Sequence, residues 1–85
     1  MTNYSIQIKS SAVKALRRIA QPDRARIIEA IDRLANEPFA GGVLKGEFSG
    51  LRRLRIGVYR VVYEVVDERL VILVIRIGRR GRVYR

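Results

Sequence analysis

Arginine and tyrosine are the side chains of this sequence that offer chemistry, because the chain contains no histidine and no cysteine. Ten arginines and no lysine fall within residues 51–85, and this segment ends Arg79-Arg80-Gly81-Arg82-Val83-Tyr84-Arg85. The missing residue types exclude a Ser-His or Cys-His nucleophile pair, a zinc site of the common kind and a paired-histidine ribonuclease. The arginines alternate with β-branched apolar residues, which predicts a folded segment rather than a basic tail.

Cleavage of RNA by its own 2′-hydroxyl suits these side chains, because that reaction requires no protein nucleophile and no metal ion. The protein must hold the scissile phosphate in line, neutralise its growing negative charge and transfer the protons. Arginine can clamp a phosphate with two N–H groups, and preorganised cations stabilise such a transition state strongly. Neighbouring guanidinium groups favour the phenolate form of a tyrosine, which would suit Tyr84 to proton transfer. A buried or base-stacking Tyr84 is the alternative that the sequence leaves open.

The composition describes one small basic domain over residues 1–85, with 48% apolar residues and a net charge of +10. The isoelectric point near 11.3 makes an anionic partner the main expectation, with nucleic acid first and an acidic protein second. The absence of cysteine is compatible with a reducing cytoplasm, and the start of the chain has no apolar signal segment. The longest aliphatic run, residues 70–75, is too short to span a bilayer, so we expect a soluble cytoplasmic protein with no membrane partner.

The hydrophobic pattern predicts a strand, two helices and three further strands. Residues 4–8 alternate polar and apolar side chains, as in a half-buried strand. Ser10 or Ser11 can cap a first helix, and Pro22 suits the first turn of a second helix that continues through Leu34. Strands are expected near residues 51–56, 58–66 and 70–77, with a turn at Gly57. This order predicts an α+β fold, β-α-α-β-β-β, in which a helical hairpin packs on one face of an antiparallel sheet.

Charged positions on the expected strands define a candidate site. Arg53 and Arg55 are two residues apart on one strand, so their side chains project from the same face about 7 Å apart. Arg60 follows just after the turn, and Arg76 lies late in the last strand. Like charges crowded on one face destabilise a sheet unless an anion lies between them. A solvated basic face, with arginine stems covering apolar surface, is the alternative interpretation.

Two segments of this sequence resemble the RelE/ParE toxin superfamily. One is residues 44–65, LKGEFSGLRRLRIGVYRVVYEV, and the other is the ending IGRRGRVY at residues 77–84. The N-terminal half is similar too, with a strand followed by a helical hairpin that ends in an Asn-Glu-Pro-Phe segment at residues 36–39. The chain is more similar to the RelE branch, whose members are metal-independent mRNA endoribonucleases that cut the codon in the ribosomal A site. ParE-type members share the fold but poison DNA gyrase.

The resemblance implies roles for five residues. Arg53 and Arg55 correspond to the paired basic positions before the turn, Arg60 to the phosphate-binding arginine, Arg80 to a second catalytic arginine and Tyr84 to the catalytic tyrosine. Lysine is common at the paired positions of the family, and arginine cannot replace it as a general base because its pKa stays above about 12. Proton transfer is therefore expected to fall on Tyr84, with Arg80 as a possible donor to the leaving oxygen.

Other basic residues are expected to bind the surrounding RNA. These candidates are Lys45, Arg52, Arg79 and Arg82. Many members of the family carry histidine at the position of Arg79, so this chain has lost a second titratable group. No cofactor is expected.

Membership would also imply partners. A RelE-type toxin acts on mRNA in the ribosome, with contacts to ribosomal RNA, and is neutralised by a small acidic, RelB-like antitoxin in a hetero-oligomer. Two other functions stay open: a ParE-like gyrase inhibitor without nuclease chemistry, and a non-catalytic basic binding module. The combination of Tyr84 with Arg53, Arg55, Arg60 and Arg80 favours the nuclease, because a gyrase inhibitor has no need of a tyrosine among arginines.

Overall fold

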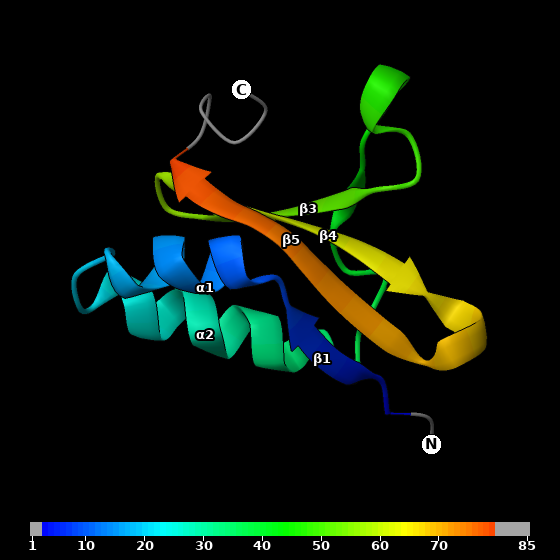
Figure 1. Cartoon of the computed structure of the whole chain (residues 1–85), viewed down its shortest axis with the longest axis horizontal. Coiled ribbons are helices and arrows are strands. Elements are labelled where there is room, and N and C mark those ends of the chain that lie inside the picture. The colour runs from blue at the N-terminus through cyan, green and yellow to red at the C-terminus, as the bar shows by residue number, and fades with distance from the viewer. Residues whose placement is uncertain (1–2, 80–85) are drawn as a thin grey trace.

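Two helices lie against one face of a five-stranded sheet in the computed structural model, which describes residues 3–79 (Figure 1). The elements follow in the order β1 (Ser5–Ile8), α1 (Ser10–Arg17), α2 (Asp23–Arg33), β2 (Gly42–Val43), β3 (Arg52–Ile56), β4 (Tyr59–Val66) and β5 (Val71–Arg79). Short 3₁₀ turns precede β3 and join β4 to β5, at Gly46–Phe48 and Asp67–Arg69 respectively. The predicted α+β class, the helical hairpin and the last three strands are confirmed.

The strands are ordered β1-β5-β4-β3-β2 across the sheet. The pairs β2–β3, β3–β4 and β4–β5 are antiparallel, whereas β1 runs parallel to β5, with Ser5 opposite Val71 and Ile8 opposite Val74. The predicted antiparallel sheet is confirmed for the first three pairs, and the parallel pairing of β1 with β5 is the exception. Strand β2 runs opposite to β1, and β3 turns back into the direction of β1. The β3–β4–β5 meander then places the last strand beside the first in the same direction.

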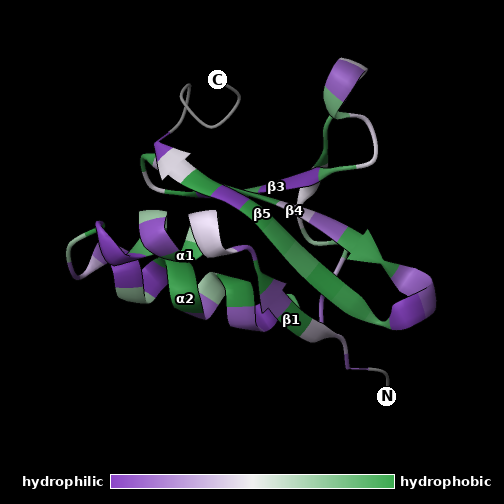
Figure 2. Cartoon of the chain, viewed as in Figure 1, coloured by the Kyte–Doolittle hydropathy of each residue, from purple (hydrophilic) through white to green (hydrophobic). Residues whose placement is uncertain are grey.

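The core lies between the helices and the sheet. Each helix buries one apolar stripe, which includes Leu16 of α1 and Ile27 and Ile31 of α2. These side chains meet alternate residues of the central strands, and burying each one stabilises the fold by about 1.5–3 kcal/mol. Figure 2 shows a long apolar stretch along β5, whereas both helices carry hydrophilic as well as apolar residues.

The helix starts differ slightly from the predicted ones. Lys9 occupies the cap position of α1 and no side chain bonds the free N–H groups there, so the expected serine cap is wrong. Ser10 and Ser11 are the first residues within the helix. Pro22 immediately precedes α2, and Asp23 lies in the first turn, where its charge favours the positive end of the helix dipole. Within residues 3–79, no helix has the length and apolar character needed to cross a membrane.

Candidate functional site

Strand register brings four arginines onto the sheet face opposite the helices. Arg55 of β3 lies directly opposite Arg60 of β4. In the next row of this face, Val62 of β4 lies between Arg53 of β3 and Arg76 of β5. Rows on one face are about 7 Å apart, and neighbouring strands are separated by about 4.8 Å. We call the set of Arg53, Arg55, Arg60 and Arg76 the arginine face.

A two-residue hairpin loop sets the pairing of Arg55 with Arg60. Ile56 and Tyr59 close the loop, and Gly57 occupies its first position with a φ of +60°. A positive φ at this position is typical of the tight turns that match the twist of a hairpin, and glycine adopts it without strain. The predicted turn at Gly57 is thus confirmed, and it fixes the register of the two arginines.

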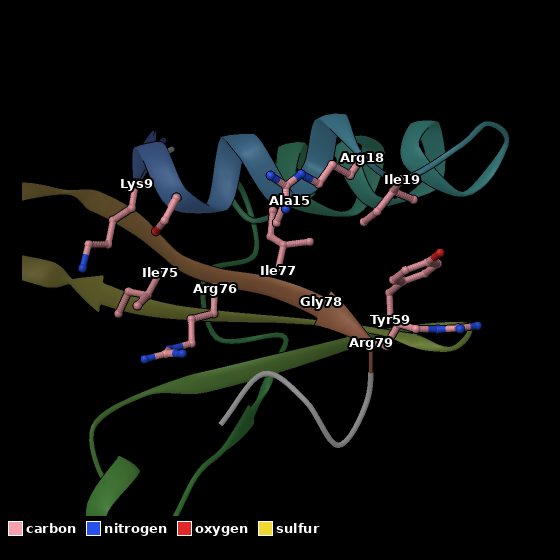
Figure 3. A pocket seen from close by; sticks show the side chains of 11 residues that line it. Lys9, Ala15, Arg18, Ile19, Tyr59, Ile75, Arg76, Ile77, Gly78 and Arg79 are labelled. Carbon is pink, nitrogen blue, oxygen red and sulfur yellow. The ribbon is translucent and has the colours of Figure 1, made fainter. Parts of the chain in front are cut away.

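An irregularity in β5 places Arg76 on this face. Tyr63 pairs with Val74 and Val62 pairs with Arg76, so the register skips Ile75. Without this bulge, the alternation that turns Val74 toward the helices would turn Arg76 toward them as well. Instead Ile77 enters the core, and Figure 3 shows its side chain pointing toward α1 while Arg76 points away from the helices. Bulges of this kind re-aim side chains next to functional sites.

The arginine face has an apolar floor. Val62 is only 1% exposed although it lies outside the core cluster, on the side of the sheet away from the helices. The aliphatic stems of arginines can cover such a residue while their charged ends stay in water. The Nε atom of Arg60 is also buried, so the base of this side chain is recessed into the face.

The charge of this face favours an anionic ligand. Side chains directly opposite one another on adjacent strands have Cβ atoms about 5 Å apart, and like charges there are destabilising. Arg55 and Arg60 have this relation, and Glu64 is the only acidic residue within β3, β4 and β5. A phosphate between the guanidinium groups would accept charge-assisted hydrogen bonds from them.

Arg52 has a different environment from Arg53. Its Nη1 atom donates hydrogen bonds to the carbonyl oxygens of Gly41, at 2.8 Å, and of Phe39, at 3.4 Å. The guanidinium carbon also lies 4.9 Å from the centre of the Phe39 ring, within cation–π range. Arg52 therefore fastens the segment between α2 and β2, and its place is apart from the arginine face.

Tyr63 also holds the segment between α2 and β2, through hydrogen bonds of its hydroxyl group. This residue is fully buried, and its hydroxyl donates to the Pro38 carbonyl oxygen and accepts from the Gly41 N–H, both at 2.9 Å. Burial raises the pKa of the Tyr63 phenol, although the Gly41 N–H and the charge of Arg52 act in the opposite direction. We call Tyr63, Arg52 and their backbone partners at residues 38–41 the rim latch.

Gly41 and Gly42 join the rim latch to the arginine face. A Cβ atom at Gly41 would lie 2.5 Å from the Arg53 carbonyl oxygen and 2.7 Å from the Tyr63 hydroxyl, so only glycine fits there. At Gly42, a Cβ atom would lie 2.4 Å from Nη1 of Arg53. The sequence interpretation of these glycines as turn residues missed both contacts, since neither partner is near them along the chain.

A hollow of about 680 Å³ lies beside the arginine face, between α1 and β5 (Figure 3). Lys9, Arg18, Arg76 and Arg79 line it, and none of its lining residues is acidic. Strand β1 ends at Ile8, opposite Val74, so it does not pair with the part of β5 that borders this hollow. Arg76 belongs to both features, which makes the positive surface continuous around the edge of the sheet.

The remaining predicted residues are distributed as follows. Arg79 is exposed at the end of β5, opposite Tyr59, and Lys45 is exposed between β2 and the following 3₁₀ turn. Arg80, Arg82 and Tyr84 lie outside the described residues. No group of three or more His, Cys, Asp and Glu side chains within residues 3–79 is arranged to hold a metal ion.

The fold and the sequence define a class of protein. A family model described as the ParE toxin of the type II toxin-antitoxin system parDE matches residues 6–84. The chain therefore belongs to the RelE/ParE family of type II toxin-antitoxin toxins.

Within that family, the proteins similar to this chain include RelE and RelG toxins. It is 33% identical to Toxin RelE of Mycobacterium tuberculosis over 84 residues, which cover 96% of this chain and 87% of the relative. It is 29% identical to Toxin RelG of the same organism over 96% of this chain and 97% of that protein. The archaeal RelE–RelB complex of Pyrococcus horikoshii contains a chain that is 34% identical, with a TM-score of 0.80 and coverage of 95% and 99%. This chain is accordingly a type II toxin-antitoxin toxin of the RelE family.

Proposed function

We propose that this toxin is a ribosome-dependent mRNA endoribonuclease that cleaves codons in the A site without a metal ion. The observation that supports this most directly is the arginine face, in which three antiparallel strands present four guanidinium groups around one apolar residue. Such a face suits a single phosphodiester chain better than a diffuse basic surface does, because the rows of cations are fixed by strand register. The bidentate geometry of guanidinium groups matches phosphate oxygens.

The proposed reaction uses the 2′-hydroxyl of the substrate as nucleophile. Its oxygen forms a bond to the scissile phosphorus while the bond to the 5′-oxygen breaks, which leaves a 2′,3′-cyclic phosphate and a 5′-hydroxyl. Arg55 and Arg60, which face each other across β3 and β4, would stabilise the phosphorane charge, and Arg53 would bind a neighbouring phosphate. Tyr84, as its phenolate, takes the proton from the 2′-hydroxyl. Arg80 donates a hydrogen bond to the leaving 5′-oxygen, which takes a proton from water to become the 5′-hydroxyl.

The proposed partners follow from the same surfaces. The mRNA codon would cross the arginine face, with Arg79, Arg82 and Lys45 binding flanking mRNA or ribosomal RNA. A cognate antitoxin of the RelB type would neutralise the toxin in the cytoplasm. RelB–RelE complexes recur among the similar solved structures, including the RelBE2 complex of M. tuberculosis, with 26% identity, a TM-score of 0.86 and 95% coverage of both chains.

Inhibition of DNA gyrase is the second candidate function. It is favoured by one observation, the match of the ParE family model to nearly the whole chain. A gyrase inhibitor would act by binding, so it would tolerate neutral replacements on the arginine face that preserve the shape of the domain. The two candidates therefore differ in their dependence on individual guanidinium groups.

Induction of the toxin followed by primer extension on a translated message tests the proposal. Codon-phased cuts confined to translated regions are expected from the wild type, whereas Arg60→Ala and Tyr84→Phe should abolish both the cuts and the growth arrest. Arg17→Ala, on the exposed side of α1, is the matched control and should cleave like the wild type. Growth arrest with intact messages and trapped gyrase–DNA complexes would refute the nuclease and support the gyrase inhibitor.

A further inference from the structure

The guanidinium group of Arg53 lies on Gly42 of the neighbouring strand. The two residues are directly paired between β2 and β3. A Cβ atom built on Gly42 would lie 2.4 Å from Nη1, 3.3 Å from Cζ and 3.6 Å from Nη2 of Arg53. Three atoms of the planar group are thus close to this one position, which means that the guanidinium rests where a side chain would otherwise project.

Backbone conformation does not require glycine here. The glycines with positive φ in residues 3–79 are Gly46, Gly50 and Gly57, and Gly42 is not among them. Alanine can therefore adopt the backbone geometry of Gly42 without the strain of a left-handed conformation. What glycine provides at this position is the space that the Arg53 guanidinium occupies.

Strand β2 cannot retreat to make room for a methyl group. The preceding residue, Gly41, is fixed by its N–H bond to Tyr63 and by the bond that its carbonyl accepts from Arg52. Gly41 also lies against the backbone of Arg53, where a Cβ atom would be 2.5 Å from the carbonyl oxygen. A methyl group at position 42 must consequently displace the flexible end of Arg53 and leave the strands where they are.

We propose that Gly42 is a positioning residue that sets the guanidinium of Arg53 for binding the RNA backbone. Gly42 and Arg53 together line a shallow hollow of about 210 Å³ that also includes Arg55, at the β2 edge of the arginine face. A phosphate that enters this hollow meets Arg53 in an orientation set by its contact with Gly42. This inference rests on the proposed RNA cleavage and adds a determinant of its geometry.

The variant Gly42→Ala tests the inference. Ordinary contact begins near 3.4 Å, so Nη1 must move by about 1 Å from its present 2.4 Å. A displacement of this size at a catalytic site can lower the rate about 100-fold. We expect a loss of this order in codon cleavage, with an unchanged or slightly raised melting temperature, because alanine restricts the unfolded chain more than glycine does.

Gly50→Ala is the matched control with the opposite pattern. Gly50 has a φ of +92° and nothing within 4 Å of its Cβ position, so alanine there strains the backbone and touches no side chain. Its melting temperature should fall by about 5 °C while cleavage well below that temperature stays at the wild-type rate. Loss of cleavage in proportion to lost stability in both variants would overturn the positioning role.

A double-mutant cycle shows whether Gly42 acts through Arg53. In an Arg53→Ala background, the further change Gly42→Ala should cost no additional activity, because the displaced group is absent. An equal loss in both backgrounds would refute the inference.

The ¹⁵N–¹H NMR signal of the Arg53 Nε, identified by its disappearance in Arg53→Lys, gives a readout that does not depend on cleavage. It should shift in Gly42→Ala and stay in place in Gly50→Ala. If the wild type cleaves no RNA, the proposed function fails, while an unmoved signal would independently overturn the role of Gly42.

Discussion

Removal of the Tyr63 hydroxyl tests the rim latch with a single-atom change. Tyr63→Phe keeps the ring that packs in the core and deletes the oxygen between Gly41 and Pro38. The Gly41 N–H is buried, so it would lose its partner with no water to replace it. A buried donor left in this state costs about 1–3 kcal/mol. The Pro38 carbonyl is only partly buried, and water can satisfy it at a smaller cost.

These contributions predict a loss of about 2 kcal/mol in the free energy of unfolding. For a domain of this size, each kcal/mol corresponds to about 4–8 °C in the melting temperature. Tyr63→Phe should therefore unfold about 8–16 °C below the wild type when its circular dichroism is followed during heating. Urea titration should show a lower midpoint with an unchanged slope, because the exposed surface on unfolding stays the same.

Tyr4→Phe is the control for this experiment. Tyr4 also donates a hydrogen bond, to Asp67, which together with that carboxylate charge raises the pKa of the Tyr4 phenol. This bond lies at an exposed position, where substitutions usually change stability by less than about 0.5 kcal/mol. If Tyr63→Phe melts within about 2 °C of the wild type, or no lower than Tyr4→Phe, the latch does not hold this part of the fold.

Three further predictions concern Tyr63, Arg52 and Arg55. Burial raises the pKa of Tyr63 above its ordinary value of 10.0, so its contribution to stability is complete below about pH 10 and is lost as pH rises through the folded-state pKa. Alkaline unfolding, followed by circular dichroism, should be less steep in Tyr63→Phe. Arg52→Lys should lower stability by about 1 kcal/mol in urea titration, through lost hydrogen bonds and ring contact, and leave the salt dependence of RNA binding unchanged. Arg55→Gln should reduce the log–log salt slope of binding to a single-stranded RNA by about 0.7, whereas Arg17→Gln should not; equal slopes for both variants would separate the arginine face from RNA binding.

Periodicity in the sequence was sufficient to predict the strands of the arginine face. The spacing of Arg53 and Arg55 predicted that both side chains lie on one face of the sheet. Gly57 predicted the turn that brings Arg60 beside them. The same alternation also separates Arg52 from Arg53, because neighbours on a strand point to opposite faces. RNA binding by Arg52 remains a prediction, and its side chain lies on the other face of β3 from Arg53 and Arg55. Arg52 contacts the carbonyl oxygens of Phe39 and Gly41 and the ring of Phe39. No local sequence pattern connects these groups to β3.

Other features depend on contacts that a single sequence does not encode locally. The alternation of β1 identifies a strand but does not reveal that β5 is its neighbour or that the pair is parallel. Gly41 and Gly42 resemble any loop glycines until Tyr63 and Arg53 are placed against them. The roles that the family resemblance gives to Arg80 and Tyr84 remain predictions, because both residues lie outside residues 3–79.

The bulge at Ile75 explains how one strand serves both the core and the arginine face. Over Ile72 and Val74, β5 alternates so that even-numbered residues face the helices, and strict continuation would bury Arg76. A buried guanidinium without compensation costs several kcal/mol, so the unbulged register is unfavourable. Skipping one residue instead buries Ile77 and turns Arg76 outward, opposite Val62. The energetic preference of the core for Ile77 over Arg76 therefore completes the arginine face, which means that the packing on one side of the sheet fixes the cations on the other.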